Sequence, residues 1–513
     1  MSLPEQTASL PEQTGFFGHP KGLRTLFFAE FWERFSYYGM RALLILFMST
    51  PIAAGGLGWD VAKAGPLYGL YTSMVYLMSL PGGWIADRIL GSRKSVFWGG
   101  TLIMLGHVAL AIPGVIGTFF LGLALIVMGT GLLKPNISTM VGKLYAPADE
   151  RRDAGFSIFY MGINLGAMIA PLITSFLAQS DTWKGVLAGW GLDPVSSWHW
   201  GFGATAVGMA IGLTVYVLDK RTLGDAGIAP AVTSAPAQSQ ARQQLWLGVG
   251  IVVAALLLLV ILNATGVIAL SVLGITKGFG AFMTLLVVGF FYWLIWLVNW
   301  TPEERKRVVV IAVLFLGAVV FWSLFEQAGS TLTLFADRST RNEIFGIKFG
   351  SGSWQSINSA WVVVLAPTFA WIWIKLGKHN PSSPAKFAFG LFFAALSFAV
   401  MVPAAQLAAG GNRVGWWWLM ASYFFASVGE MCLSPVGLSA MTKLAPARVA
   451  SLVMGVWFLA TSVGDFIAGV VSGFYEKLSG TTIFGLVALI TLAFAVLLAF
   501  MVRPIRNMLE REG

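Results

Sequence analysis

The stretch that decides the fold is AEFWERFSYYGMR, residues 29–41, because it carries ionisable side chains into a segment that otherwise resembles a membrane span. At 100° per residue its charged and tyrosine side chains fall within one arc of a helix, whereas Phe31, Trp32 and Phe35 lie on the opposite side. The apolar run continues through residues 43–47 (LLILF). Charged groups in a membrane span are costly and face a bundle interior or a water-filled cavity. We therefore predict that the polar face points inward.

Composition predicts an all-α, polytopic membrane protein. Of the 513 residues, 57% are hydrophobic and only 11% are charged, with a mean hydropathy of +0.76, whereas about a quarter of residues are charged in ordinary soluble domains. The net charge of +10 could suggest nucleic acid, but the basic residues are scattered between apolar segments and form no stripe. The single cysteine, Cys432, excludes an intramolecular disulfide and a cysteine-based metal site.

A helix needs about 20 largely apolar residues to cross a bilayer, and the sequence offers fourteen candidates. They lie near 25–49, 66–86, 95–114, 118–142, 155–178, 199–218, 244–263, 279–299, 309–335, 354–376, 385–405, 416–442, 450–475 and 480–502. The Ala-, Pro-, Ser- and Gln-rich segment 219–243 separates six helices from eight. We therefore expect a bundle at 25–218, a cytoplasmic linker at 219–243, two inserted helices within 244–299 that pack outside the core, and a second bundle at 309–502.

The two tails, 1–24 and 503–513, are predicted to be cytoplasmic. The N-terminal tail repeats LPEQT and lacks the basic region and apolar run of a signal peptide, so we expect it to be disordered. With the N-terminus inside, most basic residues of the connections gather on the inner side, as the positive-inside rule requires. The sequence therefore predicts an inner-membrane protein with both termini in the cytoplasm.

The two halves of the chain resemble each other at a shift of 300 residues. The recurring residues are Gly129, Leu133, Pro135, Lys143, Leu144 and Gly155, which return as Gly429, Leu433, Pro435, Lys443, Leu444 and Gly455. Parallel repeats of this kind are typical of transporters that bind substrate between two halves. A channel is less consistent with such a repeat and with charges of both signs in the spans.

Away from the ends of the predicted spans lie five acids and three bases: Glu30, Glu33, Glu326, Glu430 and Asp465 against Arg34, Arg41 and Lys134. Unpaired carboxylates in a medium of low dielectric are relieved by binding a proton. The surplus acids are therefore candidate proton carriers. Lys143 lacks the flanking residues of a phosphate-binding loop, so we expect neither nucleotide nor any other cofactor, and no metal.

Each of these residues also has a plainer interpretation. Glu33 and Arg34 could form a structural ion pair that locks the bundle, and the aromatic residues Tyr37, Tyr38, Tyr76, Trp322 and Trp457 could serve only in packing or at the membrane interface. Asp465 is interpreted as a helix-packing or gating residue with no further role assigned. A membrane-embedded enzyme is the alternative from another class, but a zinc-binding HExxH, a GxSxG nucleophile or a pair of aspartates is missing from the spans.

Five motifs in order resemble the signatures of the proton-dependent oligopeptide transporter family, which belongs to the major facilitator superfamily. They are Glu30-x-x-Glu33-Arg34-Phe35-x-Tyr37-Tyr38-Gly39, Gly83-x-x-Ala86-Asp87-Arg88-x-x-Gly91-x-Arg93, Lys134-Pro135-Asn136, Phe159-Tyr160-x-x-Ile163-Asn164-x-Gly166 and Ser434-Pro435-x-Gly437. The resemblance covers essentially the whole chain, including the two extra helices of bacterial members. It implies a major facilitator fold and proton-driven import of di- and tripeptides by alternating access, with contact to membrane lipid and no obligate protein partner.

The resemblance also implies roles for individual residues. Arg41 and Lys134, with Tyr38 and Tyr76 nearby, meet the peptide carboxylate, while Glu430 takes the amino terminus with help from Asn164 and Asn358. Side-chain pockets are assigned to Tyr37, Trp322, Ser434 and Trp457. Glu30, Glu33 and Arg34 with Lys134 form a proton-coupling cluster, and Glu326 is a second protonation site that pairs with Arg41 across the outer gate. Asp87, Arg88 and Arg93 are expected to form charge pairs that gate the inner face.

One departure from the family pattern affects the mechanism. Animal members have a histidine on the second helix, and residues 66–86 contain none, so carboxylates must carry the proton here. A symporter of an anion or another small metabolite is the alternative within the family. The presence of both Glu33 and Glu430 favours peptides.

Overall fold

The computed structural model describes residues 14–146, 149–231, 234–446 and 450–510. Within them, ten helices are long and apolar enough to cross a membrane, so the number fourteen stays a prediction. Helix α1 (Lys21–Ser49) is not among the ten, because Glu33, Arg34 and Arg41 put too much charge into its apolar windows. Residues 1–13 and 511–513 of the predicted tails, together with Arg448, lie outside the described residues.

The first bundle is built around α1, which packs against α6 and α8. Its other helices are α2 (Val61–Leu77), α3 (Ser79–Ile85), α4 (Ser92–Leu110), α5 (Ile116–Lys143), α6 (Arg152–Gln179), the short α7 (Asp181–Gly189) and α8 (Ser197–Leu218). The predicted helix 66–86 is divided into α2 and α3 and ends in the π-helical turn η2 (Ala86–Leu90). Short turns η1 (Ile52–Ala54), η3 (Pro194–Ser196) and η4 (Lys220–Leu223) complete this half.

The second bundle contains α11 (Pro302–Phe325), α12 (Thr331–Ser339), α13 (Ser356–Leu376), α14 (Ser383–Ala399), α15 (Met401–Ala408), α16 (Trp417–Leu444), α17 (Ala450–Ser472) and α18 (Gly480–Glu510). The predicted helix 309–335 is interrupted at the 3₁₀ turn η6 (Glu326–Gly329). The connection from α12 contains the hairpin of β3 (Glu343–Ile344) with β4 (Ile347–Lys348) and the turn η7 (Ser351–Gln355), and η8 (Gly377–His379) follows α13.

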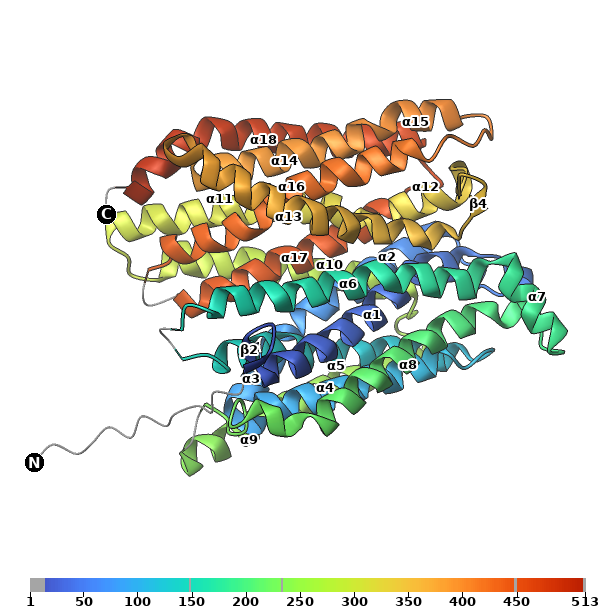
Figure 1. Cartoon of the computed structure of the whole chain (residues 1–513). Coiled ribbons are helices and arrows are strands. Elements are labelled where there is room, and N and C mark those ends of the chain that lie inside the picture. The colour runs from blue at the N-terminus through green and yellow to red at the C-terminus, as the bar shows by residue number, and fades with distance from the viewer. Residues whose placement is uncertain (1–13, 147–148, 232–233, 447–449, 511–513) are drawn as a thin grey trace, which may run out of the picture.

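Figure 1 shows the helices running in roughly one direction, with the second bundle as the upper layer and α1, α4, α5 and α8 below it. Helix α1 begins and α18 ends at the same end of the molecule, which we call the termini end. The opposite end, where α1 and α17 end and α2 begins, is the distal end. The hydrogen bonds between the bundles among described residues lie in the distal half, for example Gln179 to Ser351 and Ser73 to Ser462.

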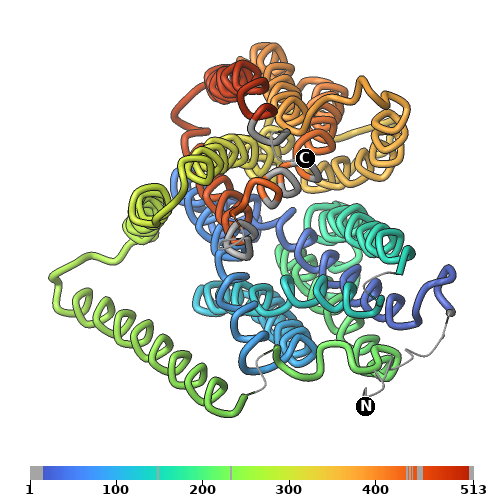
Figure 2. The backbone as a smooth tube through the Cα atoms, turned by 90° about the vertical axis from the view of Figure 1, so that its left-hand side faces the viewer, coloured from blue at the N-terminus to red at the C-terminus, as the bar shows by residue number. Residues whose placement is uncertain are grey.

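Of the two inserted helices, the first lies outside the core as predicted, whereas the second buries Met283 against the second bundle. Figure 2 shows that α9 (Ala235–Ala264) stands apart from the bundles, and Ala241 is its only buried residue. Helix α10 (Val272–Tyr292), which ends in the π-turn η5 (Trp293–Leu297), contacts α2. Helix α9 begins at Ala235 rather than near 244, so part of the predicted linker is helical.

The expectation of a disordered tail up to residue 24 is wrong for its described part. Strand β1 (Thr14–Phe16) pairs with β2 (His19–Pro20), and α1 already begins at Lys21. His19 Nδ1 lies 2.9 Å from the hydroxyl of Tyr145, and Arg24 forms an ion pair of 2.7 Å with Asp219. These contacts hold the segment against the termini end of the first bundle.

The 300-residue repeat is visible as matching helix contacts. Gly129 of α5 packs on Gly99 of α4, where an added Cβ would lie 2.5 Å from the Gly99 carbonyl oxygen. Its counterpart Gly429 of α16 packs on Gly390 of α14, where the corresponding distance is 2.8 Å. Small residues let helix backbones approach closely inside a membrane. The same helix pair is therefore joined in the same way in each half.

We predict that Gly129→Ala lowers the free energy of unfolding by about 1–3 kcal/mol, because the new methyl group would overlap the backbone of Gly99 and the backbone and side chain of Ile103. Gly117→Ala on the same helix is the matched control, since a Cβ there meets nothing closer than 4.0 Å. Thermal unfolding in detergent micelles compares the two. Equal melting temperatures for both variants would show that the α4–α5 contact tolerates a side chain.

Candidate functional site

The polar face of α1 points inward, as predicted, and its first part is a buried cluster centred on Arg34. The Arg34 guanidinium pairs with Glu33 and lies with Nε 3.2 Å from Glu30 Oε1. All three side chains are at most 4% exposed. One arginine thus serves two carboxylates, and the cluster carries a net negative charge when both are ionised. Glu30 Oε2 and Glu33 Oε1 have no hydrogen-bond partner among the described residues.

The second part of that face joins the two bundles through Arg41. Its Nη2 lies 2.6 Å from Glu326 Oε2, so the predicted pair is formed. Arg41 Nε also donates to the Tyr68 hydroxyl at 2.8 Å. The glycine at the end of η6 makes room for this approach, because a Cβ on Gly329 would lie only 2.7 Å from Arg41 Nε. The interruption of the helix at η6, which was not predicted from the sequence, therefore lies directly beside the ion pair.

Glu430 lies on the other bundle, on α16, and has an amide as its neighbour. Asn358 Nδ2 donates to Glu430 Oε2 at 3.3 Å and to Ser427 Oγ at 2.9 Å. The predicted partnership with Asn358 is therefore present. Asn164 instead donates its side-chain N–H to the Tyr160 carbonyl at 3.0 Å.

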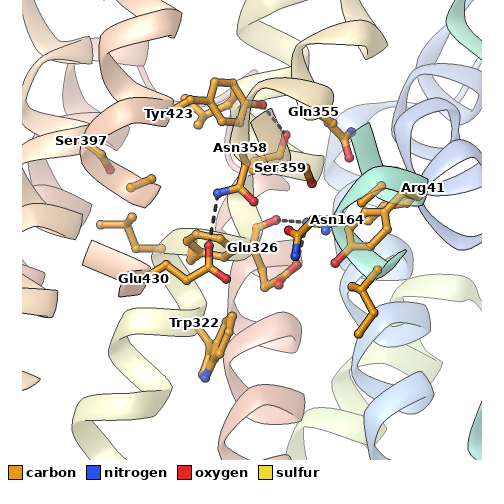
Figure 3. Close-up of a pocket in the computed structure, with 18 of the residues that line it drawn as sticks. Arg41, Asn164, Trp322, Glu326, Gln355, Asn358, Ser359, Ser397, Tyr423 and Glu430 are labelled. Carbon is orange, nitrogen blue, oxygen red and sulfur yellow. Dashed lines mark hydrogen bonds and ion pairs between the residues drawn. The ribbon is translucent and has the colours of Figure 1, made fainter. Parts of the chain in front are cut away.

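A cavity of about 130 Å³ between the bundles brings Arg41, Glu326 and Glu430 together. In Figure 3, the side chains of Asn164, Asn358, Trp322 and the two acids converge on this space from different helices. The predicted residues that line it are Tyr38, Arg41, Tyr76, Asn164, Trp322, Glu326, Asn358 and Glu430. The Trp322 indole N–H has no acceptor among the described residues, so it is available as a donor. The cavity thus offers a guanidinium, two carboxyl groups and amides.

Four predicted binding residues do not line this cavity: Tyr37, Lys134, Ser434 and Trp457. Tyr37 is buried, with the Arg34 guanidinium 5.3 Å from its ring centre. Trp457 packs against Gly437, and Ser434 Oγ is buried without a partner among the described residues. The assignment of Tyr37, Ser434 and Trp457 to side-chain pockets stays a prediction.

Lys134 is placed differently from the expectation of an acidic partner. Its Nζ lies 3.6 Å from the centre of the Tyr76 ring, a cation–π contact. Within the described chain no ion pair of 4 Å or less joins it to Glu30 or Glu33. Tyr76 lines the cavity and also contacts Lys134, whereas Lys134 is not among the residues that line the cavity.

Sequence reasoning missed several polar cavity residues, namely Tyr160, Gln355, Ser359, Ser397 and Tyr423. Tyr160 and Gln355 stand beside the predicted Asn164 and Asn358, so i−4 and i−3 neighbours on a helix offered a signal. Tyr423 lies seven residues before Glu430 on α16, and the same helical spacing could have found it. The serines have no such signal.

The predicted charge pairs among Asp87, Arg88 and Arg93 are absent from the part of the chain that the structure describes. Asp87 and Arg88 are exposed on η2, and the Arg88 guanidinium lies 5.6 Å from the centre of the Trp84 ring. Arg93 instead donates to the carbonyl of Gly224 at 2.6 Å, while its backbone N–H donates to Gly227. Backbone carbonyls of the segment after α8 therefore take the place of Asp87.

A helical membrane protein with two packed bundles and a charged central cavity has the architecture of a major facilitator transporter. A family model described as "POT family" matches residues 93–487. The chain belongs to this family of transporters. It is similar to the "Uncharacterized transporter YclF" of Bacillus subtilis, with 42% identity over 97% of this chain and 96% of the relative. It is also similar to the "Peptide transporter YePEPT" of Yersinia enterocolitica, with 37% identity over 99% of this chain and 98% of the relative.

Solved structures agree with this assignment. The crystal structure of "peptide transporter POT in complex with sulfate" has a TM-score of 0.89 and 43% identity, with 99% of each chain covered. A "POT family transporter in complex with 5-aminolevulinic acid" has a TM-score of 0.86 and 35% identity, covering 96% of this chain and 98% of the other. The major facilitator fold predicted from the sequence is thereby confirmed.

The Arg41–Glu326 pair predicts a measurable loss of stability. Glu326→Leu leaves a buried guanidinium without its carboxylate, and we expect a loss of about 3 kcal/mol in the free energy of unfolding. The double variant Arg41→Met, Glu326→Leu removes both charges and should recover part of that loss. Thermal unfolding in detergent measures both variants. A double variant that is less stable than Glu326→Leu alone would show that the missing partner is not the cause.

Proposed function

We propose that this protein is a proton-coupled symporter that imports di- and tripeptides by alternating access. The observation that carries the proposal is the cavity between the bundles, which presents Arg41 from one side and Glu430 from the other. A free peptide bears one negative and one positive end, and each finds an opposite charge there. A relative from Lactococcus lactis, 36% identical over 98% of this chain, is named "Di-/tripeptide transporter".

The peptide carboxylate binds Arg41, with Tyr38 and Tyr76 beside it, and the ammonium group binds Glu430 with Asn358. Arg41 is occupied by Glu326 at 2.6 Å, so the carboxylate must replace that acid. Protonation of Glu326 removes its charge and frees the guanidinium for the peptide. Proton and peptide therefore favour each other's binding, which is the condition for coupling.

The membrane topology completes the proposal. The distal end, where the bundles are joined, faces the outside. Both termini lie on the cytoplasmic side of a bacterial inner membrane. The apolar surface of α9 contacts lipid. The gradient of protons supplies the energy, so no cofactor, catalytic chemistry, nucleic acid or obligate protein partner is needed.

The direct test is uptake of labelled dialanine into proteoliposomes with and without an imposed inward proton gradient. We expect the gradient to drive accumulation of dialanine above its outside concentration. Absence of gradient-driven uptake, with purified protein correctly inserted, would contradict the proposal.

A second substrate class has one observation in its favour. The structure of a relative of 35% identity was solved in complex with 5-aminolevulinic acid. This compound carries an amino group and a carboxylic acid. A small metabolite with both charges would satisfy Arg41 and Glu430 as well. Competition between dialanine and 5-aminolevulinic acid for uptake ranks the two classes.

Glu33→Gln is expected to abolish gradient-driven dialanine uptake while leaving peptide exchange partly active. The neutral amide keeps a hydrogen-bond partner for Arg34 but removes one of the two carboxylates that Arg34 serves. Uptake and counterflow in the same proteoliposomes separate coupling from binding. Unimpaired gradient-driven uptake would remove Glu33 from the coupling mechanism.

Glu430→Gln is expected to weaken the binding of free dialanine about tenfold or more, because an ammonium group loses its charged partner. Dialanine with an acetylated amino end has no positive charge to lose and should be affected much less. Competitive inhibition by the two peptides measures the difference. Equal loss for both would refute the assignment of Glu430 to the amino terminus.

A further inference from the structure

Asp465 is the buried acid for which the transport cycle above has no use. It lies on α17, is 1% exposed, and neither carboxyl oxygen has a hydrogen-bond partner among the described residues. Burying an ionised carboxylate without a partner costs several kcal/mol. The closed arrangement seen here is therefore compatible with a neutral Asp465 and costly for an ionised one.

The position of Asp465 is set by the contact between α17 and α2, which joins the bundles at the distal end. Ser462, one turn before it, hydrogen-bonds to Ser73 at 2.8 Å. Gly469, one turn after it, packs so closely on α2 that a Cβ on Gly69 would lie 2.8 Å from its Cα. Residues at i−3 and i+4 share a helix face. Asp465 therefore faces α2 in the middle of this interface.

The interface leaves little room to solvate the carboxylate. A Cβ on Gly69 would also lie 3.1 Å from the Asp465 carbonyl oxygen, so the two backbones nearly touch beside it. Alternating access requires the bundles to separate at the distal end, and separation of α2 from α17 exposes Asp465 to solvent on that side. The charge on Asp465 is then tolerated in the open state and penalised in the closed one.

The charged neighbours do not neutralise the charge of an ionised Asp465 carboxylate. The groups that act on it electrostatically are Tyr37 and Arg41 of α1, Tyr68 and Tyr76 of α2, Lys134 of α5 and Glu326 of η6. The other helices packed against α17 are α10, α11 and α16, whose titratable groups within the spans include Lys277, Tyr423, Glu430 and Cys432. Arg41 is taken by Glu326 and Lys134 by the Tyr76 ring. Neither cation forms an ion pair of 4 Å or less with Asp465 within the described chain.

We propose that Asp465 is a proton-binding site of the distal gate: its carboxylate takes up one proton from the outer solution when α2 and α17 pack together, and returns it there when they separate. The proposal rests on the alternating access of the proposed function. Because the proton enters and leaves on the same side, it adds nothing to the number of protons transported. Acidic outer solution favours the closed gate, and alkaline solution favours the open one.

The test measures the gate directly, in nanodiscs without substrate. Spin labels are placed at Lys63 on α2 and Lys477 after α17, in a Cys432→Ala background, and the closed-to-open ratio is read from their distance distribution between about pH 5 and about pH 8. Each proton taken up on closure changes that ratio by up to about tenfold per pH unit. Glu326 is a second ionisable group close to this interface, so the experiment compares the size of the slope between variants and not only whether the ratio depends on pH.

We expect Asp465→Asn to reduce the slope by up to one proton and to keep the gate closed at alkaline pH. Asp465→Glu should restore the slope. Asp60→Asn, which removes an exposed carboxylate at the start of α2, is the matched control and should keep the original slope. An unchanged slope in Asp465→Asn, or a gate held open by it, would overturn the proposal.

Dialanine transport separates this proposal from the proposed function. If the unmodified protein fails to carry dialanine but its gate still loses one proton of pH dependence in Asp465→Asn, the substrate assignment fails and the gate site stands. If dialanine uptake is driven by the gradient and the slope is unaffected by Asp465→Asn, the transporter stands and the gate site fails.

Discussion

The structure depends on how an apolar bundle accommodates more acids than bases. Five carboxyl groups and three cations lie within the described bundles, all of them buried except the half-buried Glu430 and Lys134, and the cations are distributed unevenly among the acids. Arg34 serves both Glu30 and Glu33, and Arg41 serves Glu326. Glu430 has an amide neighbour, and Asp465 has no partner among the described residues. Since full ionisation leaves a net negative interior at low dielectric, protons and a positively charged ligand end are the species that restore neutrality.

This charge distribution is tied to the way in which the bundles meet. The Arg41–Glu326 pair, the Ser73–Ser462 hydrogen bond and the close approach of Gly69 to Gly469 all connect the halves in the distal part of the molecule. The central cavity lies where these contacts begin, with Arg41 in both the gate and the site. A ligand that takes Arg41 away from Glu326 therefore acts on the joint between the bundles. In the proposed function, binding and conformational change therefore use the same atoms.

Much of the fold followed from local patterns in the sequence. The polar arc of residues 29–41 lies on one helix, so its inward face could be predicted from periodicity, whereas the pairing of Arg41 with Glu326 came from the family resemblance. The break at Glu326–Gly329 was not predicted from the sequence; Gly329 makes a close contact there with Arg41 of the other bundle, which no local sequence pattern indicates. The same holds for Lys134. Charge alone assigned it to Glu30 or Glu33, whereas α5 packs against α2 and Lys134 Nζ lies over the Tyr76 ring of that helix.

The contact of Lys134 with Tyr76, in place of the expected acidic partner, bears on function. Its ring lines the cavity and also contacts Lys134 Nζ, which lies outside the cavity. A cation–π contact holds a lysine far less strongly than a buried ion pair with a carboxylate, so Lys134 is the cation that is most easily redirected. In the proposed function, a peptide carboxylate that enters beside Tyr76 competes with an ionised Glu33 for this one ammonium group. We therefore propose that Lys134, which contacts a ring that lines the cavity, couples the protonation of the Arg34 cluster to the occupancy of the cavity.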